Sequence, residues 1–368
     1  MAPPVLSTRE LNRALMARQG LLSRRSGAAA EEIERLVGLQ GQEPENAYVA
    51  LWLRLSDFDP LELSSLIASR AAVRSSLMRA TIHLSTSRDC LAWQPLMASV
   101  LHRTWKAPWM PPLGGEDVDA IVAAGAELLQ GGARTRAEIR DEIAPRFPKA
   151  EPLAVAYAVT SNLPLVQVPP RGLWQQSGAA RWALTEEFLG APLSASPSVE
   201  DLVLRYLTAF GPASSADVRT WSNLTGLRPV LTALMPDLRV FHDEAGRELL
   251  DVPDGLLPDP DVPAPPRFLP EYDNVALGHK DRSRVFDGRG CGGPFFTGKW
   301  HGTLWVDGFY RANWRLLLDD DGAAVVTVDR LALFDSDPAG TREEIVAEAE
   351  ALGRFVFPDA ASHATIVS

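Results

Sequence analysis

Cysteine is nearly absent from the 368-residue sequence, and histidine and lysine are scarce. The two cysteines, Cys90 and Cys291, are too few for a disulfide framework or an all-cysteine zinc site, and they fit a reducing, cytoplasmic location. The six histidines include no pair at metal-ligand spacing, so we predict no metal cofactor. The phosphate-binding loop and the H-E-x-x-H and G-x-S-x-G motifs are also missing, and we expect no other cofactor.

Long apolar runs are missing as well. No run reaches the roughly 18 residues that a membrane span needs, so we expect no membrane partner. The first residues contain no apolar core of a signal peptide, and we expect no secretion. Apolar residues make up 46% of the chain and charged residues 23%, which excludes disorder as the main state. At roughly 100–200 residues per domain, the length predicts two or three structural units.

The net charge of −11 argues against a simple nucleic-acid coat protein, but the charge is unevenly distributed. Residues 1–108 carry 13 basic and 10 acidic side chains, whereas residues 237–273 carry 3 basic and 10 acidic ones. A basic face can therefore persist beside acidic segments. Only four of the 36 basic residues are lysine, and arginine is the better bidentate ligand of phosphate. A GC-rich genome would also enrich arginine, so both explanations stay open.

Groups of helices followed by a short hairpin recur three times along the chain. The predicted helices span residues 8–24, 28–40, 46–55 and 60–69, then 116–130, 135–146 and 152–162, then 198–210, 214–222 and 227–234. The hairpin strands that follow them are predicted at 73–78 and 81–86, at 165–168 and 173–175, and at 238–242 and 248–252. Three helices and a two-stranded wing are the winged-helix layout.

We therefore predict a mainly α fold with β wings, made of three tandem winged-helix units. Their predicted bounds are 1–110, 111–195 and 196–255. Seven prolines between residues 251 and 270 predict an extended linker. Residues 256–368 are predicted to hold this linker and a small antiparallel β-unit or barrel, with strands at 295–296, 302–306, 314–318 and 323–333 and a closing helix at 341–355.

A glutamine stands where the helical pattern calls for an apolar side chain. In the helix predicted over 28–40, the apolar residues at 33, 36 and 37 form a stripe that Gln40 continues. Gln42 follows across Gly41, and in an extended segment it shares a side with Gln40. Gly41 and Pro44 predict that the helix stops here. On these residues alone, the first interpretation is a glutamine pair that hydrogen-bonds the free backbone groups at a helix end. The alternative is a functional site that both side chains share.

Five segments resemble, in order, the AlkZ-like (YcaQ-like) winged-helix DNA glycosylase family. They are Arg9-x-x-Asn12-Arg13, Leu39-Gln40-Gly41-Gln42-Glu43-Pro44, Arg79-Ala80-Thr81-Ile82-His83-Leu84, Pro170-Arg171-Gly172-Leu173-Trp174 and Phe268-Leu269-Pro270-Glu271-Tyr272-Asp273-Asn274. The resemblance implies tandem winged helices and a β-barrel that close into a C-shape around double-stranded DNA. It implies a glutamine–apolar–glutamine catalytic motif, matched by Gln40 and Gln42 with Gly41 between them.

The activity that the resemblance implies is hydrolysis of the bond between deoxyribose and N7-alkylated guanine. It includes the unhooking of interstrand crosslinks, as self-resistance to a genotoxin. A neutral amide is not a strong general base, but it orients a water or stabilises charge. Since N7-alkylation makes guanine cationic, its glycosidic bond breaks without an acid to protonate the base. Two amides that place one water below the sugar would then suffice.

Basic side chains near these segments are predicted to contact DNA. For His83, a DNA contact and a structural hydrogen bond both stay open. His279, Lys280, Arg282 and Arg284 form a local basic cluster, predicted as a hairpin on the DNA backbone. The arginines of the first helix are individually expected to be solvated.

The alternative to an enzyme is a non-catalytic binding protein. Three winged helices also suit a transcription regulator or a drug-binding protein. A regulator usually acts as a dimer on two half-sites, whereas a glycosylase encloses one lesion as a monomer, which we favour. Arg219, Asn223 and Arg228 would suit a base-reading helix of a regulator. A concave basic face around Gln40 and Gln42 would indicate the enzyme.

Overall fold

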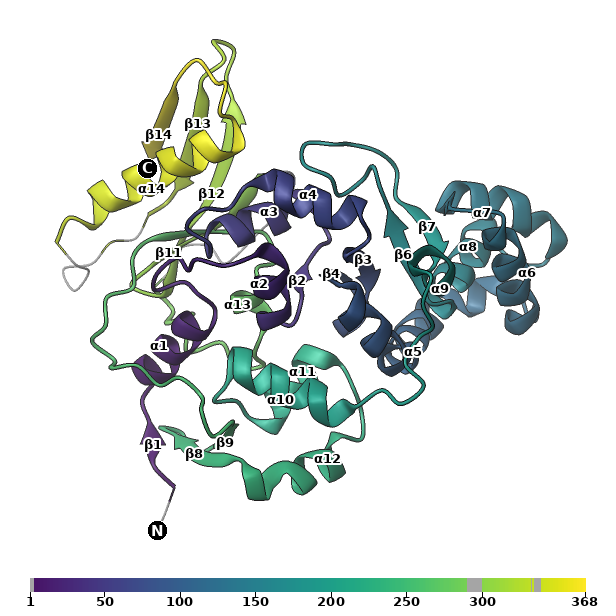
Figure 1. The fold of residues 1–368 in the computed structure, drawn as a ribbon, viewed down its shortest axis with the longest axis horizontal. Coiled ribbons are helices and arrows are strands. Elements are labelled where there is room, and N and C mark those ends of the chain that lie inside the picture. The colour runs from purple at the N-terminus through teal and green to yellow at the C-terminus, as the bar shows by residue number, and fades with distance from the viewer. Residues whose placement is uncertain (1–2, 290–299, 332, 334–338) are drawn as a thin grey trace.

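The computed structural model describes residues 3–289, 300–331, 333 and 339–368 of the chain. Helices alternate with short strands that form three separate sheets, so the fold is mixed α/β (Figure 1). The strand predicted at Phe295–Phe296 and the second cysteine, Cys291, lie outside the described residues.

The first two predicted hairpins belong to one six-stranded sheet, in the order β2-β4-β3-β6-β7-β5. Pairing of Arg74 with Gln167 and of Ser75 with Val166 joins the two hairpins antiparallel through β3 and β6. The strand bounds are β2 Leu39–Gln40, β3 Ala72–Ser76, β4 Ile82–Thr86, β5 Arg134–Thr135, β6 Leu165–Val168 and β7 Arg181–Leu184.

The second strand predicted for the middle hairpin, at 173–175, is wrong. The strand that pairs with β6 is β7, which starts eight residues after that prediction begins. The segment in between is used differently, because the ring of Trp174 packs against Tyr48 at 4.8 Å, Phe355 at 5.3 Å and Trp300 at 5.9 Å. Trp174, whose residue type is common in strands, therefore anchors a loop to other parts of the fold.

Most helices of the first half pack around this sheet, whereas α1 packs against α10. The helix α5 covers 23 residues that the sequence analysis left without an element, and it contains Pro95 and Pro108. Thr86 caps its start by accepting from the amide of Asp89. The helices are α1 Thr8–Arg18, α2 Ala29–Arg35, α3 Pro44–Trp52, α4 Pro60–Ala68, α5 Ser87–Trp109, α6 Val118–Gln130, α7 Arg136–Ile143, α8 Pro152–Asn162 and α9 Thr185–Leu189.

The predicted helix over 28–40 is too long. α2 ends at Arg35, and the backbone then turns because Val37 and Gly38 have φ of 59° and 83°. Gln40 therefore lies on β2, and the argument that it continues a helical stripe is wrong. The helix does not run on through Gly41 and Pro44, as predicted, but it ends at Arg35, ahead of both glutamines.

The third group consists of α10 Val199–Phe210, α11 Ser215–Ser222 and α12 Leu227–Leu234, followed by β8 Arg239–Asp243 and β9 Glu248–Asp251. These bounds follow the sequence prediction closely, since serine caps start α10 and α11. A short strand near the N-terminus, β1 Val5–Leu6, pairs parallel with β8 and completes a three-stranded sheet.

The C-terminal sheet corrects two predictions. Its order is β10-β11-β12-β13-β14, and β14 pairs parallel with β13, so the sheet is mixed and not purely antiparallel. The predicted closing helix is followed by β14, because α14 carries the chain back to the sheet. No pairing joins β10 to β14 among the described residues, which leaves the sheet open. The bounds are β10 Arg267–Pro270, α13 Asn274–Leu277, β11 His301–Val306, β12 Phe309–Leu318, β13 Ala324–Asp329, α14 Thr341–Val356 and β14 His363–Val367.

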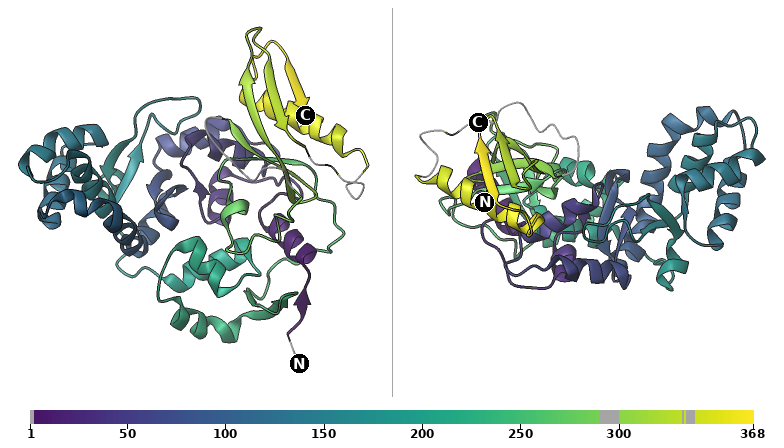
Figure 2. Two further views of the ribbon diagram at one scale, coloured as in Figure 1. Left: turned by 180° about the vertical axis from the view of Figure 1, so that it is seen from behind. Right: turned by 90° about the horizontal axis from the view of Figure 1, so that it is seen from above.

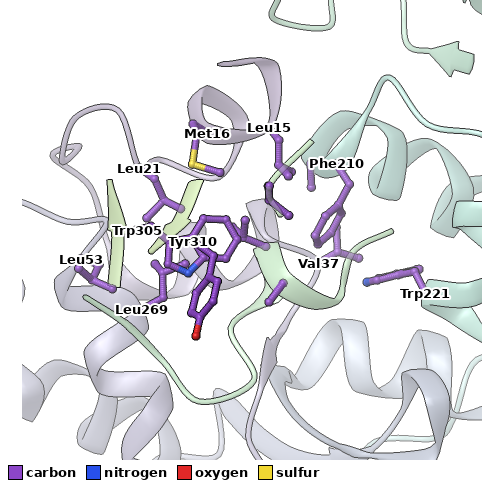
Figure 3. Close-up of a cluster of buried hydrophobic side chains, with 14 of the residues drawn as sticks. Leu15, Met16, Leu21, Val37, Leu53, Phe210, Trp221, Leu269, Trp305 and Tyr310 are labelled. Carbon is purple, nitrogen blue, oxygen red and sulfur yellow. The ribbon is translucent and has the colours of Figure 1, made fainter. Parts of the chain in front are cut away.

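One large core joins distant parts of the chain. Leu15 and Met16 of α1 pack in one cluster with Phe210 of α10, Trp221 of α11 and Trp305 of β11 (Figure 3). α6, α7 and α8 enclose a separate core. Figure 2 shows these three helices and the C-terminal sheet at opposite ends of the molecule.

The prediction of solvated arginines on the first helix is wrong for Arg13 and Arg18. Both side chains are buried. Arg13 pairs with Asp307 and donates to the Val262 carbonyl, while Arg18 holds both carboxylate oxygens of Asp251, at 2.6 and 2.8 Å. A buried guanidinium needs a carboxylate partner, and these partners lie more than 200 residues further along the chain.

Candidate active site at the edge of the six-stranded sheet

Gln40 ends the edge strand β2, directly opposite His83 of β4. Its side chain is only 8% exposed, and its Oε1 accepts a hydrogen bond of 2.7 Å from Arg79 Nη2. The backbone amide of Gln40 faces Asn274 Oδ1 at 3.4 Å, and Asn274 Nδ2 donates to the Gly38 carbonyl at 2.7 Å. Both the side chain and the backbone of Gln40 are therefore held in place.

His83 is a buried, neutral imidazole. Burial, followed by the charge of Arg79, lowers the pKa of His83 to about 3. Its Nδ1 donates to the Thr81 carbonyl at 2.9 Å, so Nε2 carries the lone pair and faces Arg79 Nη2 at 3.4 Å. Of the two interpretations of His83, the geometry gives it a structural hydrogen bond within the hairpin turn and leaves its ring only 2% exposed.

Arg79 connects this pair to the third group of helices. Its Nη1 donates to the Trp221 carbonyl at 2.9 Å, while Nη2 reaches Gln40 and His83. Burial and the nearby Arg282 lower the pKa of Arg79 to about 10, which leaves it charged at neutral pH. A charged donor therefore fixes the Gln40 amide through its Oε1.

Gly41 lies against β4. A Cβ atom at this position would stand 3.2 Å from the Leu84 amide nitrogen and 3.5 Å from the His83 carbonyl carbon, so there is little room for a side chain. The Gly41 amide donates to the Ile82 carbonyl at 2.8 Å, and its carbonyl accepts from Arg74 Nη2 at 2.7 Å. The close approach explains why the smallest residue stands between the two glutamines.

Gln42 is exposed and lines a pocket of about 790 Å³ that Gln40 does not line. Gln40, His83 and Ser75 share one face of the sheet, because they lie directly opposite one another on neighbouring strands. Arg74, Gln167 and Trp182 share the other face and line the pocket with Gln42. The chain bends at Gln42, so the alternation of an extended segment does not continue there.

The basic segment 279–284 is divided between interior and surface. It is a loop after α13 and not a hairpin. His279 and Arg284 are buried, where His279 Nε2 donates to the Phe210 carbonyl at 3.0 Å and Arg284 donates to the Pro212 carbonyl at 2.9 Å. Burial, followed by Arg284, lowers the pKa of His279 to about 3. Of the four basic side chains, Lys280 and Arg282 remain at the surface, available to the predicted DNA contact.

Other segments of the resemblance hold the fold together. Asn12 donates to the carbonyls of Arg284 and Gly308, and Arg9 pairs with Asp307 at 2.6 Å. Asp273 forms a fully buried, bidentate pair with Arg54 at 2.8 and 2.9 Å. These residues therefore tie the N-terminal helices to the C-terminal part of the chain.

The sequence analysis missed Arg74 and Arg136, which line the pocket with Gln42. Arg74 stands in an apolar strand run, where a buried arginine is unusual, and that was the available signal. Nothing local distinguishes Arg136, whose guanidinium lies over the Tyr157 ring at 4.2 Å. Neither residue could be linked to Gln42 without the sheet pairing.

The described residues contain no group of three or more side chains suited to hold a metal ion. None of their helices is both long and apolar enough to cross a membrane.

The chain has the fold of a DNA glycosylase of known structure. Streptomyces sahachiroi DNA glycosylase AlkZ superimposes with a TM-score of 0.73 over 99% of this chain and 100% of that chain, at 20% identity. The chain itself belongs to the AlkZ-like family of DNA glycosylases, since residues 33–355 match the family model described as DNA glycosylase AlkZ-like. An Interstrand DNA cross-link repair glycosylase of Streptomyces sahachiroi is 26% identical over 254 residues, which cover 64% of each protein.

Proposed function

We propose that this protein hydrolyses the N-glycosidic bond of cationic N7-alkylguanine in double-stranded DNA. The observation that carries the proposal is the position of Gln42, an exposed amide at the edge of an arginine-lined pocket, in a chain of the AlkZ-like family. The unhooking of interstrand crosslinks, as resistance to a genotoxin, is part of the proposal, and the name of the Streptomyces sahachiroi relative supports it.

The two glutamines have different roles in this proposal. Gln42 is free to orient a water molecule, because its side chain reaches solvent. Gln40 is held by Arg79 through Oε1 on the face of the sheet opposite the pocket that Gln42 lines, and it does not line that pocket. We assign the water to Gln42, and to Gln40 the support of β2, the strand that leads into Gln42.

Such a site suits a leaving group that is already activated. Neither amide protonates a departing base, and His83 is neutral with its lone pair directed at Arg79. An N7-alkylguanine leaves as a neutral base once its glycosidic bond breaks, so no acid is required. An uncharged lesion such as uracil lacks this advantage and is expected to be a poor substrate.

The arrangement of the whole chain completes the proposal. We propose that the three helical groups are tandem winged-helix units with the bounds 1–110, 111–195 and 196–255, followed by the linker and C-terminal β-unit of 256–368. A monomer of this kind would curve around one duplex, with Lys280 and Arg282 on its backbone.

The test is incubation with duplex DNA that carries a single N7-methylguanine. Free N7-methylguanine is measured by chromatography and the abasic site by strand cleavage in alkali. We expect both products, with the same yield in EDTA because no metal takes part. Tight duplex binding without base release would instead favour the non-catalytic regulator.

A further inference from the structure

The pocket beside Gln42 has an unusual charge. Three arginines line it, Arg74 from β3, Arg136 from α7 and Arg171 from the loop after β6, and no Asp or Glu is among the described residues that line it. None of the three forms an ion pair within the described part of the chain. The buried arginines Arg18 and Arg54, by contrast, each hold an aspartate.

Several hydrogen-bonding groups around this pocket have no partner. Among the described residues that line the pocket, the unpaired buried atoms are Nε and Nη1 of Arg74, Nε of Arg136, Nε1 of Trp105, Oγ1 of Thr160 and Oε1 of Gln167. The four nitrogen atoms are donors, the Thr160 hydroxyl donates or accepts, and Gln167 Oε1 is the one acceptor in this set, so donors predominate. Arg74 is only 3% exposed. Buried polar groups are normally paired, and each unpaired one costs about 1–3 kcal/mol, so these donors indicate a missing acceptor.

Neighbouring groups fix the position of the Arg74 side chain. Its Nη2 donates to the Gly41 carbonyl, and a Cβ on Gly172 would stand 3.0 Å from Arg74 Cδ, so two glycines make room for this side chain. The backbone of Gly172 has φ of 107°, which favours glycine. Burial, followed by Arg171, lowers the pKa of Arg74 to about 10, and the guanidinium stays charged at neutral pH.

From this geometry we infer that the pocket binds a phosphodiester group of the DNA strand and holds that strand against Gln42. A phosphodiester supplies the negative charge and the several acceptor oxygens that the unpaired donors lack. The cationic alkylguanine base does not suit this pocket, because three arginines repel it. The stacked rings of Trp109 and Tyr157, 3.9 Å apart, give the same nucleotide an apolar surface beside its phosphate.

The inference rests on the proposed function, since it takes the ligand to be DNA. It assigns Arg74, Arg136 and Arg171 as positioning residues, which affect the reaction by holding the DNA strand in position. Loss of one of them is expected to raise the DNA concentration needed for half-maximal rate, while the single-turnover rate at saturating protein changes little.

The experiment compares Arg171→Gln and Arg136→Gln with Arg146→Gln. The control removes the same charge from an exposed arginine near the end of α7 that does not line the pocket. Fluorescence anisotropy measures binding to a labelled, undamaged duplex at several KCl concentrations, and melting temperatures confirm folding. Each pocket variant is expected to bind more weakly and to show a salt slope smaller by about 1, the effect of one lost phosphate contact. Arg74→Gln is added if it folds.

Equal duplex affinity and salt slope in the pocket variants and in Arg146→Gln would overturn the inference. Inorganic phosphate and deoxyadenosine monophosphate form a second arm, followed by tryptophan fluorescence. If these free anions bind the wild type while the pocket variants keep full duplex affinity, the site serves a free anion and the strand assignment is wrong. Base release by the wild type is measured separately, so the proposed function can fail while the pocket still contacts DNA, and the reverse.

Discussion

At the scale of single residues, the two glutamines differ in how firmly the protein holds them. Gln40 is buried and accepts from a charged arginine, whereas Gln42 is exposed and bends away to the other side of the sheet. A substitution at Gln40 therefore affects both stability and chemistry, and one at Gln42 mainly chemistry.

We expect Gln40→Ala to lower the free energy of unfolding by about 1.5–3 kcal/mol, because it removes a hydrogen bond to a charged donor and leaves Arg79 without that acceptor. Urea denaturation measures this change. Gln176→Ala, an exposed glutamine outside the pocket, is the control and should leave stability unchanged. A Gln40→Ala protein as stable as the wild type would contradict the observed hydrogen bond.

The buried His83 gives a prediction for pH. Its pKa is about 3 in the fold against about 6.5 when unfolded, so the unfolded chain binds one more proton between these values. The contribution of His83 to stability is complete above pH 6.5 and is lost as the pH falls toward 3. The loss amounts to about 1.4 kcal/mol per pH unit.

His83→Gln should therefore flatten the decline of unfolding free energy between pH 6.5 and pH 4.5. Urea titrations at several pH values measure the slope, and the surface variant His102→Gln is the control. An unchanged slope in His83→Gln would show that the ring is not kept neutral by the fold.

At the scale of elements, the spacing of β2 and β4 depends on Gly41. A Cβ there would approach the Leu84 amide nitrogen to 3.2 Å, and the partner is backbone that moves only with its strand. We expect Gly41→Val to destabilise the protein by about 1–3 kcal/mol, the usual cost of overpacking, and Gly41→Ala to cost less. Thermal melting and urea denaturation test the order. A stabilised Gly41→Val would mean that the strand yields and that this position accepts the apolar residue which the resemblance implies.

The link between α1 and β9 depends on the buried pair of Arg18 and Asp251. Asp251→Asn leaves the Arg18 charge buried without its counter-ion, and we expect a loss of about 3–5 kcal/mol of unfolding free energy. The matched control is Asp141→Asn, whose exposed pair with Arg140 should contribute almost nothing. A similar effect of both variants in urea denaturation would contradict the importance of this pair.

The elements also show what the sequence could predict. Capping serines marked the starts of α10 and α11, and the helices predicted over 152–162 and 227–234 have their observed bounds. The long helix α5 was missed because its interior prolines resemble breakers. β7 was misplaced because tryptophan is common in strands, whereas Trp174 lies in a loop and packs against aromatic rings from distant parts of the chain.

At the scale of the whole molecule, the pairs that matter most join residues far apart in the chain. Arg13 with Asp307 and the pocket between Gln42 and Arg136 have no local signature, so the sequence could indicate Gln40 and Gln42 but not their surroundings. The net charge of −11 likewise gave no indication of a basic pocket. Many arginines neutralise carboxylates inside the fold, while those around Gln42 have no carboxylate among the described residues that line the pocket.

The central claim is that Gln42 carries the excision of a cationic base. The most direct test is the single-turnover release of N7-methylguanine by the wild type, Gln42→Ala and Gln42→Glu, with Gln176→Ala as the control. Melting temperature and duplex affinity are measured on the same preparations.

We expect Gln42→Ala to bind DNA and melt as the wild type does, while base release falls about 100-fold, the low end for a group that orients a water. Gln42→Glu should retain activity, because a carboxylate also orients water and stabilises positive charge on the sugar. Base release at the wild-type rate by folded Gln42→Ala would contradict the account.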